Sequence, residues 1–251
     1  MDRRSWITAA FGGAAGLAAL FSGNLFAQDA NAPRERRLGN RQQRGERTMT
    51  RYENARFYNA DGSFNEAAAK EAYVELFRFH RYTLAEVVDD PRFWMLDFGL
   101  GDFANVGMGG IFWVNDKEHG YFGHDIYLLP GQMIPEHGHF EGEGKPAKHE
   151  YWQVRNGSIY NFGQGGSKDD KFPIELPKSQ LEANAITAFK CTELKAGTGE
   201  KSEAVLDKLG NYHFMIAGPE GAIVTEYASY HSGDGLRFQN KKAIMGNTPK
   251  K

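Results

Sequence analysis

The residue pattern of the chain after Phe93 constrains the fold more than any other feature. From there onward the sequence consists of short apolar, aromatic and β-branched runs, each interrupted within a few residues by glycine or proline. Such runs are typical of strands separated by turns in a sandwich or barrel. The 30 glycines and the aromatic content of 13% agree with this. We therefore predict an all-β fold, with strands over 93–98, 111–114, 127–129, 151–154, 158–162, 185–192, 213–217 and 222–229.

A short helical segment is predicted before these strands. Ser63 and Glu66 have the spacing of a capping box, directly after the turn residues Asp61 and Gly62. A helical apolar stripe follows and ends near His80; it comprises Ala68, Tyr73, Leu76 and Phe77. A second short helix is predicted over 84–88, before Pro91.

The first 51 residues are not expected to belong to this fold. Arg3 and Arg4 precede an apolar stretch rich in glycine and alanine, and small-residue cleavage sites follow as far as Ala32. This order is typical of a secretory signal, and the paired arginines resemble a twin-arginine signal. We predict a signal peptide over 1–32, a flexible arginine-rich linker over 33–51 and a single domain over 52–251. The mature protein is then periplasmic or extracellular, with an uncleaved membrane anchor as the alternative.

Charge and cysteine content argue against several kinds of partner. The net charge is −2, and acidic and basic residues are interspersed after the linker. No surface for a polyanion is therefore expected, so we predict no nucleic acid partner and no membrane contact after signal removal. Cys191 is the only cysteine, which excludes an intrachain disulfide.

Two pairs of residues separated by one position carry the chemistry. Side chains two apart on a strand point to the same face, so His137 and His139 project together, about 7 Å apart along the chain. Lys148 and Glu150 form a second same-face pair, and His149 points to the opposite face. Glu150 is therefore a better candidate ligand than His149 for an ion held by the two histidines.

The spacing around these pairs resembles the cupin pattern. Gly131 lies six residues before His137, and Gly157 lies seven after Glu150, as in that pattern; the ten residues between His139 and Glu150 form a longer loop than most cupins have. The second cupin pattern ends in Gly-x-x-His, which His213 matches, although its usual proline is replaced by Lys208. The resemblance implies a cupin fold, a double-stranded β-helix or jelly-roll barrel. Four other histidines are less well placed by pattern: His80, His119, His124 and His231.

Three imidazoles and one carboxylate, from His137, His139, Glu150 and His213, predict a divalent metal site. We expect Mn²⁺ first, with Zn²⁺, Fe²⁺, Co²⁺ and Ni²⁺ as alternatives. The opposing interpretation is that these histidines are ordinary strand residues satisfied by hydrogen bonds.

A narrower resemblance covers roughly residues 93–240. The segment Asp97-Phe98-Gly99-Leu100-Gly101 looks like one in the D-lyxose isomerase family of cupins. Pro-Gly-Gln at 130–132, Pro-Glu-His at 135–137 and Lys-x-Glu at 148–150 take the places of further family segments. Tyr-His-Phe at 212–214, a glutamate at Glu226 and a late arginine at Arg237 complete the match.

The resemblance implies aldose–ketose isomerisation of a free monosaccharide through an enediol, of the D-lyxose/D-xylulose or mannose/fructose type. Glu226 is then the candidate base for the carbon-bound proton, and Lys148 polarises a sugar oxygen or moves the oxygen-bound proton. Arg237 and Asp234 would orient sugar hydroxyls. Lys148 as a simple ion-pair partner and Arg237 as a surface residue are the alternatives.

Two other functions remain open at this point. Cupins with three histidines and a glutamate also include metal-dependent oxygenases and decarboxylases, and a non-catalytic cupin would bind metal and sugar without turnover. A homodimer with twofold symmetry is the expected assembly.

Overall fold

The computed structural model describes residues 48–249. The predicted signal peptide and most of the predicted linker lie outside the described residues. Within this part of the chain the all-β prediction with a short N-terminal helical segment is confirmed.

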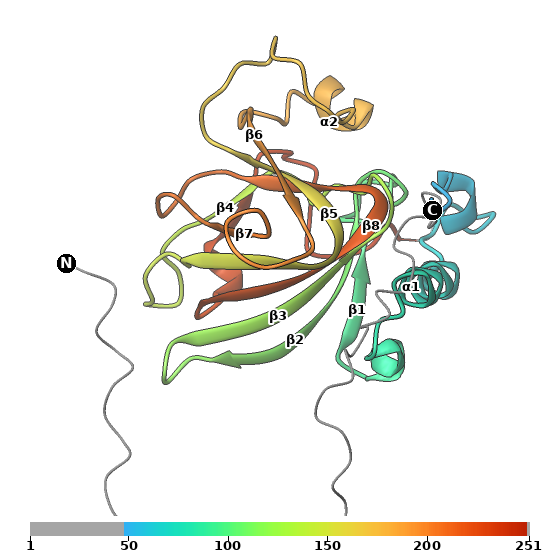
Figure 1. The fold of residues 1–251 in the computed structure, drawn as a ribbon, viewed down its shortest axis with the longest axis horizontal. Helices are drawn as coiled ribbons and strands as arrows, with labels where there is room; N and C mark the ends of the chain where they lie inside the picture. Colours follow the sequence, from blue (N-terminus) through green and yellow to red (C-terminus); the bar gives the residue numbers. More distant parts are fainter. Residues whose placement is uncertain (1–47, 250–251) are drawn as a thin grey trace, which may run out of the picture. The chain divides into compact units, whose positions relative to one another are not determined.

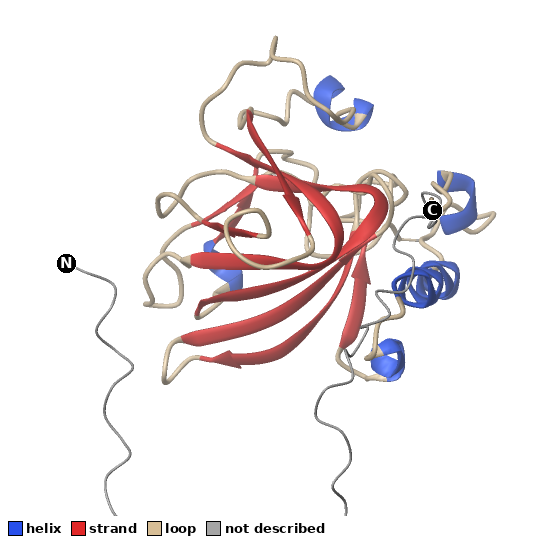
Figure 2. Cartoon of the chain, viewed as in Figure 1, coloured by secondary structure: helices blue, strands red, loops and turns tan. Residues whose placement is uncertain are grey.

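One curved antiparallel sheet forms the body of the domain (Figures 1 and 2). Its strands lie in the order β1 (Phe93–Leu96), β2 (Met108–Asp116), β3 (Tyr121–Leu128), β8 (Phe214–Ser229), β5 (Glu150–Gly163) and β6 (Lys190–Lys195), and β7 (Glu203–Val205) also pairs with β5. A separate two-stranded sheet joins β4 (His137–His139) to β9 (Leu236–Phe238).

Two pairs of predicted strands are each a single strand in the structure. The segments predicted over 151–154 and 158–162 are one strand, β5, and those over 213–217 and 222–229 are one strand, β8. Gly157 explains why the predicted break at this point is not a turn. Its φ is 70°, and the register of the β5–β8 pairing shifts on either side of it. A Cβ at Gly157 would lie 2.0 Å from the Gly221 carbonyl oxygen. These glycines permit a bend and a close approach within paired strands, where the sequence suggested turns.

The helix α1 (Glu66–His80) ends where the apolar stripe predicted, but its N-cap differs. Asn65 is the cap, and its side-chain oxygen accepts a hydrogen bond from the Ala68 amide at 3.1 Å. The predicted cap, Ser63, donates its hydroxyl to Asp61 at 2.6 Å instead, which stabilises the preceding turn. The short helices are η1 (Asn54–Phe57), η2 (Ala85–Asp89), α2 (Lys178–Glu182) and η3 (Gly233–Gly235). No helix within residues 48–249 is long and apolar enough to cross a membrane.

Strand alternation gives the large sheet two different faces. On β3, Tyr127 packs with α1 residues such as Phe77, whereas Ile126 packs on the opposite face with Val224 of β8. Figure 1 shows α1 on the outer side of the sheet, next to β1. The helix therefore covers one face, and the other face lines the interior in which the candidate site lies.

Candidate active site

The structure brings the four predicted ligands together from three separate segments. His137 and His139 lie on β4, Glu150 begins β5, and His213 immediately precedes β8. Their ligand atoms all lie within 4.8 Å of one another. A pair of backbone hydrogen bonds, from the His137 amide to the His213 carbonyl at 3.0 Å and back at 2.8 Å, joins the two distant segments.

The donor atoms of this cluster suit a cation. The Nδ1 atoms of His137 and His213 lie 2.9 and 3.1 Å from the carbonyl oxygens of Pro135 and Asn211, so each ring turns its Nε2 toward the centre. Nε2 of His139 and Nε2 of His213 lie 3.0 and 2.9 Å from the Glu150 carboxylate. His139 Nε2 and Glu150 Oε2 nevertheless have no hydrogen-bond partner among the described residues. Buried lone pairs that converge without partners are what a metal ion would satisfy.

The ionisation of the cluster also suits metal ligands. Burial lowers the pKa of His137 well below its ordinary value, and the pKa of His139 is lowered for the same reason. Burial alone would raise the pKa of Glu150, but Lys148 and the neighbouring histidines hold it well below its usual range. Burial alone would lower the pKa of His213, but the Glu150 carboxylate raises it above its ordinary value. His137 and His139 are therefore neutral beside an ionised carboxylate, and these are the forms that bind a metal. A bound metal would displace the proton that the raised pKa favours on His213.

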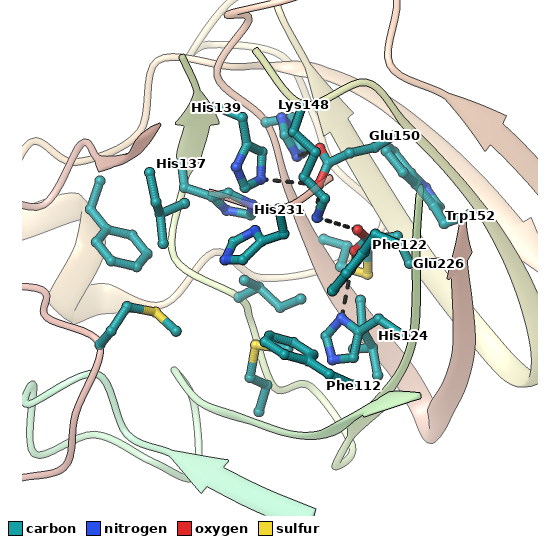
Figure 3. A pocket seen from close by; sticks show the side chains of 18 of the residues that line it. Phe112, Phe122, His124, His137, His139, Lys148, Glu150, Trp152, Glu226 and His231 are labelled. Carbon is teal, nitrogen blue, oxygen red and sulfur yellow. Dashed lines mark hydrogen bonds and ion pairs between the residues drawn. The ribbon is translucent and has the colours of Figure 1, made fainter. Parts of the chain in front are cut away.

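Lys148 joins this cluster to the predicted base. Its ammonium group lies 2.9 Å from Glu150 Oε1 and makes a closer contact with Glu226 Oε1. All three side chains are buried, and the ammonium also lies over the Phe122 ring, 4.3 Å from its centroid. Against the opposing effect of burial, Lys148 lowers the pKa of Glu226 to about 2. Figure 3 shows Lys148 between the metal-ligand cluster and Glu226.

Two histidines that the sequence pattern ranked low also line this cavity. His231 follows β8, and its ring centroid lies 5.6 Å from that of His139. Burial lowers its pKa to about 3. His124 lies on β3 with its Nδ1 3.7 Å from Glu226 Oε2. His124 lies directly opposite Glu226 in the β3–β8 pairing, and this position would identify it as a site residue. The pairing is apparent only once the β3–β8 register is known.

The two predicted sugar-orienting residues lie elsewhere. Leu236 and Phe238 of β9 line the cavity, whereas Arg237 between them is exposed and donates to the Asp234 and Leu236 carbonyls. The Asp234 carboxylate, also exposed, accepts hydrogen bonds from the Ser232 hydroxyl and the Glu143 amide. Neither Arg237 nor Asp234 is among the described residues that line the cavity.

Twenty of the described residues line the cavity, and their side chains are of two kinds. Its charged and imidazole side chains gather around Lys148 and the metal-ligand cluster. The rest of the lining is apolar or aromatic and comprises Trp94, Phe98, Met108, Phe112, Phe122, Ile126, Ile134, Trp152, Met215, Leu236, Phe238 and Met245.

The curated relatives of this sequence include D-lyxose isomerases. No family model matches the sequence. The D-lyxose/D-mannose isomerase of Thermosediminibacter oceani is 35% identical over 138 residues, which cover 55% of this chain and 70% of that protein. The D-lyxose ketol-isomerase of Cohnella laeviribosi is 31% identical over 133 residues, or 53% of this chain and 68% of that protein.

Solved structures agree on the fold. The L-ribose isomerase of Cellulomonas parahominis, determined with L-psicose, aligns with a TM-score of 0.51 at 15% identity, covering 77% of this chain and 97% of that one. The L-ribose isomerase of Acinetobacter sp. DL28 with L-ribose also gives 0.51 at 15% identity, covering 74% and 94%.

The curved antiparallel sheet, with three histidines and a glutamate gathered inside it, makes this protein a cupin, as the glycine spacings predicted. Its sequence relatives narrow the class further. The chain belongs to the D-lyxose isomerase family, and it is an enzyme of the isomerase class.

Proposed function

We propose that this protein is a metal-dependent aldose–ketose isomerase that acts on a monosaccharide of the D-lyxose or D-mannose type. The observation that supports this most is that one buried cavity holds both the four-ligand cluster and the Lys148–Glu226 pair. The names of the relatives from Thermosediminibacter oceani and Cohnella laeviribosi supply the substrate class.

His137, His139, Glu150 and His213 would hold the cation, and Mn²⁺ is our first choice. A divalent cation bound there would polarise two adjacent sugar oxygens and stabilise the negative charge that develops on them. The protein's part is to keep His137 and His139 neutral and to aim the three imidazoles at one point, for which the Pro135 and Asn211 carbonyls fix two of the rings.

Glu226 would act as the base. In the aldose-to-ketose direction, its carboxylate would take the proton from C2, which leaves an enediolate, and return that proton to C1. With a pKa near 2, the carboxylate is ionised at neutral pH. A base with so low a pKa is weak, so the contact with Lys148 has to loosen before the proton is taken.

Lys148 would loosen this contact when the sugar binds. Its ammonium has three N–H groups, two of which are engaged by Glu150 and Glu226. When a sugar oxygen accepts a hydrogen bond from it, the ammonium stabilises Glu226 less, and the carboxylate becomes a stronger base. The same group helps the proton on the C2 oxygen to reach the C1 oxygen.

The test is turnover by protein of measured metal content. Purified protein is analysed for metal and incubated with a panel of aldopentoses and aldohexoses in D₂O, and ketose formation is followed by NMR. We expect one metal per chain, ketose from D-lyxose or D-mannose, and deuterium at the reacting carbon. Glu226→Gln should keep the metal and lose ketose formation, whereas Glu182→Gln, on the surface helix α2, should keep both. Metal-loaded wild type that returns every aldose unchanged would contradict the proposal, and oxygen uptake would then be assayed.

Export and dimer formation remain proposals. Residues 1–47 carry the arginine pair on which export depends, and they lie outside the described part of the chain. Cell fractionation of the wild type and of an Arg3→Lys, Arg4→Lys variant tests export, because loss of both arginines should retain the protein in the cytoplasm. Sedimentation analysis tests the dimer.

A further inference from the structure

Within residues 48–249, the buried imidazole of His124 has a single polar contact, which is with Glu226. The two residues lie opposite each other in the β3–β8 pairing. Nδ1 of His124 lies 3.7 Å from Oε2 of Glu226, while Lys148 contacts the other oxygen, Oε1. Figure 3 shows the Glu226 carboxylate between Lys148 and His124. The carboxylate is therefore approached by a nitrogen at each of its oxygens.

The surroundings of His124 would suit an apolar ring better than an imidazole. Its ring centroid lies 5.4 Å from that of Trp94, 4.8 Å from Phe112 and 5.6 Å from Phe122. Nε2 has no hydrogen-bond partner among the residues described, and it lies so near Gly110 that a Cβ there would be 2.5 Å away. A buried polar atom without a partner is unfavourable, and phenylalanine would avoid that cost. Packing alone gives no reason for histidine at this position.

We infer that His124 is a positioning residue for Glu226: its Nδ1–H holds Oε2, so that both carboxylate oxygens are fixed before the sugar binds. The inference rests on the proposed role of Glu226 as the base. Burial lowers the pKa of His124, which keeps the ring neutral with one N–H to donate. The charged groups that act on the ring are Glu226, Lys148 and Asp125.

The contact of 3.7 Å is longer than a hydrogen bond, as is common at catalytic sites without substrate. A carboxylate held only by Lys148 could rotate when that ammonium turns to the sugar. Fixing the second oxygen through a neutral donor removes this freedom without a further charge. Misplacement of a reacting group by about 1 Å costs roughly 100-fold in rate, so the expected effect falls on kcat.

The test compares three substitutions at this position. His124→Asn places an amide N–H near the position of Nδ1, His124→Leu has nearly the same size without a donor, and His124→Phe fills the aromatic surroundings. His119→Phe, in the β2–β3 turn and exposed, is the control. Each protein is measured for metal content, thermal unfolding, kcat and KM with the aldose that the wild type converts best.

The phenylalanine and leucine variants should lose roughly 10- to 100-fold in kcat with KM within about threefold. Metal content should stay at the wild-type level, and the phenylalanine variant should unfold no earlier than the wild type. The asparagine variant should retain at least about tenfold more kcat than the leucine variant, and His119→Phe should match the wild type.

Equal kcat in the asparagine and leucine variants would overturn the inference, because the donor would then be irrelevant. So would a phenylalanine variant with wild-type kcat. The asparagine–leucine comparison decides alone if the phenylalanine variant fails to fold. A wild type that converts no aldose refutes the proposed function itself, which is a separate result.

Discussion

Replacing Lys148 by methionine removes the charge at the centre of the cavity and keeps a side chain of similar length. The wild-type side chain is 5% exposed, and its ammonium group contacts the carboxylates of Glu150 and Glu226. Removal of one partner from a buried ion pair costs about 3–5 kcal/mol, because the remaining charges stay buried without compensation. At neutral pH, and with the metal removed by a chelator, we expect the free energy of unfolding to fall by this amount. The corresponding drop in Tm is roughly 6–20 °C for a domain of this size.

The pH dependence of this loss makes the prediction specific. Burial alone would raise the pKa of Glu226, but the charge of Lys148 lowers this pKa from 4.5 to about 2. A carboxyl group whose pKa is lower in the folded state stabilises the fold above its unfolded pKa, and this contribution disappears as the pH falls toward the folded pKa. The shift corresponds to about 3 kcal/mol. Without Lys148, burial raises the pKa of Glu226, so the difference in stability between wild type and variant should narrow between about pH 5 and pH 2.

Urea unfolding of the metal-free proteins over this pH range measures the difference directly. Lys70→Met is the matched control, because Lys70 pairs with Asp89 on the surface, where the two side chains are 41% and 74% exposed. Its loss should stay below about 1 kcal/mol. A Lys148→Met loss that is constant with pH, or no larger than that of Lys70→Met, would refute the reasoning.

Three further substitutions test a metal ligand and two residues that support the fold around the site. His137→Ala should lower the metal bound per chain, measured by elemental analysis; full retention would show that this imidazole is no ligand. Glu136 is fully buried and accepts hydrogen bonds from the Thr187 and Ala188 amides, so Glu136→Ala should cost about 2–4 kcal/mol in urea unfolding; a loss under about 1 kcal/mol would contradict this. Gly157→Ala should lower Tm by at least roughly 5 °C, whereas Gly163→Ala on the same strand, where a Cβ meets nothing within 4 Å, should not; equal effects would count against the close approach at Gly221.

Local pattern was enough to predict which side chains share a face. The alternation of side chains along a strand placed His137 with His139, and Lys148 with Glu150, on the same side, and the structure has them so. The same rule places Arg237 on the opposite face of β9 from Leu236 and Phe238, and the structure has it exposed there. The N-cap was missed at Asn65 because Ser63 and Asn65 both have side chains that cap, and only the path of the turn selects between them.

The sequence by itself determined the strand texture, the helix end at His80 and the same-face pairs, because these depend on neighbours a few residues apart. Only the tertiary structure decided which residues from distant parts of the chain lie opposite those pairs. His213 reaches His137 through a backbone bridge, and His124 reaches Glu226 through strand register, each across more than 70 residues of chain. No local preference encodes such a register, because it depends on how strands far apart in the sequence pair and pack on both faces of one sheet.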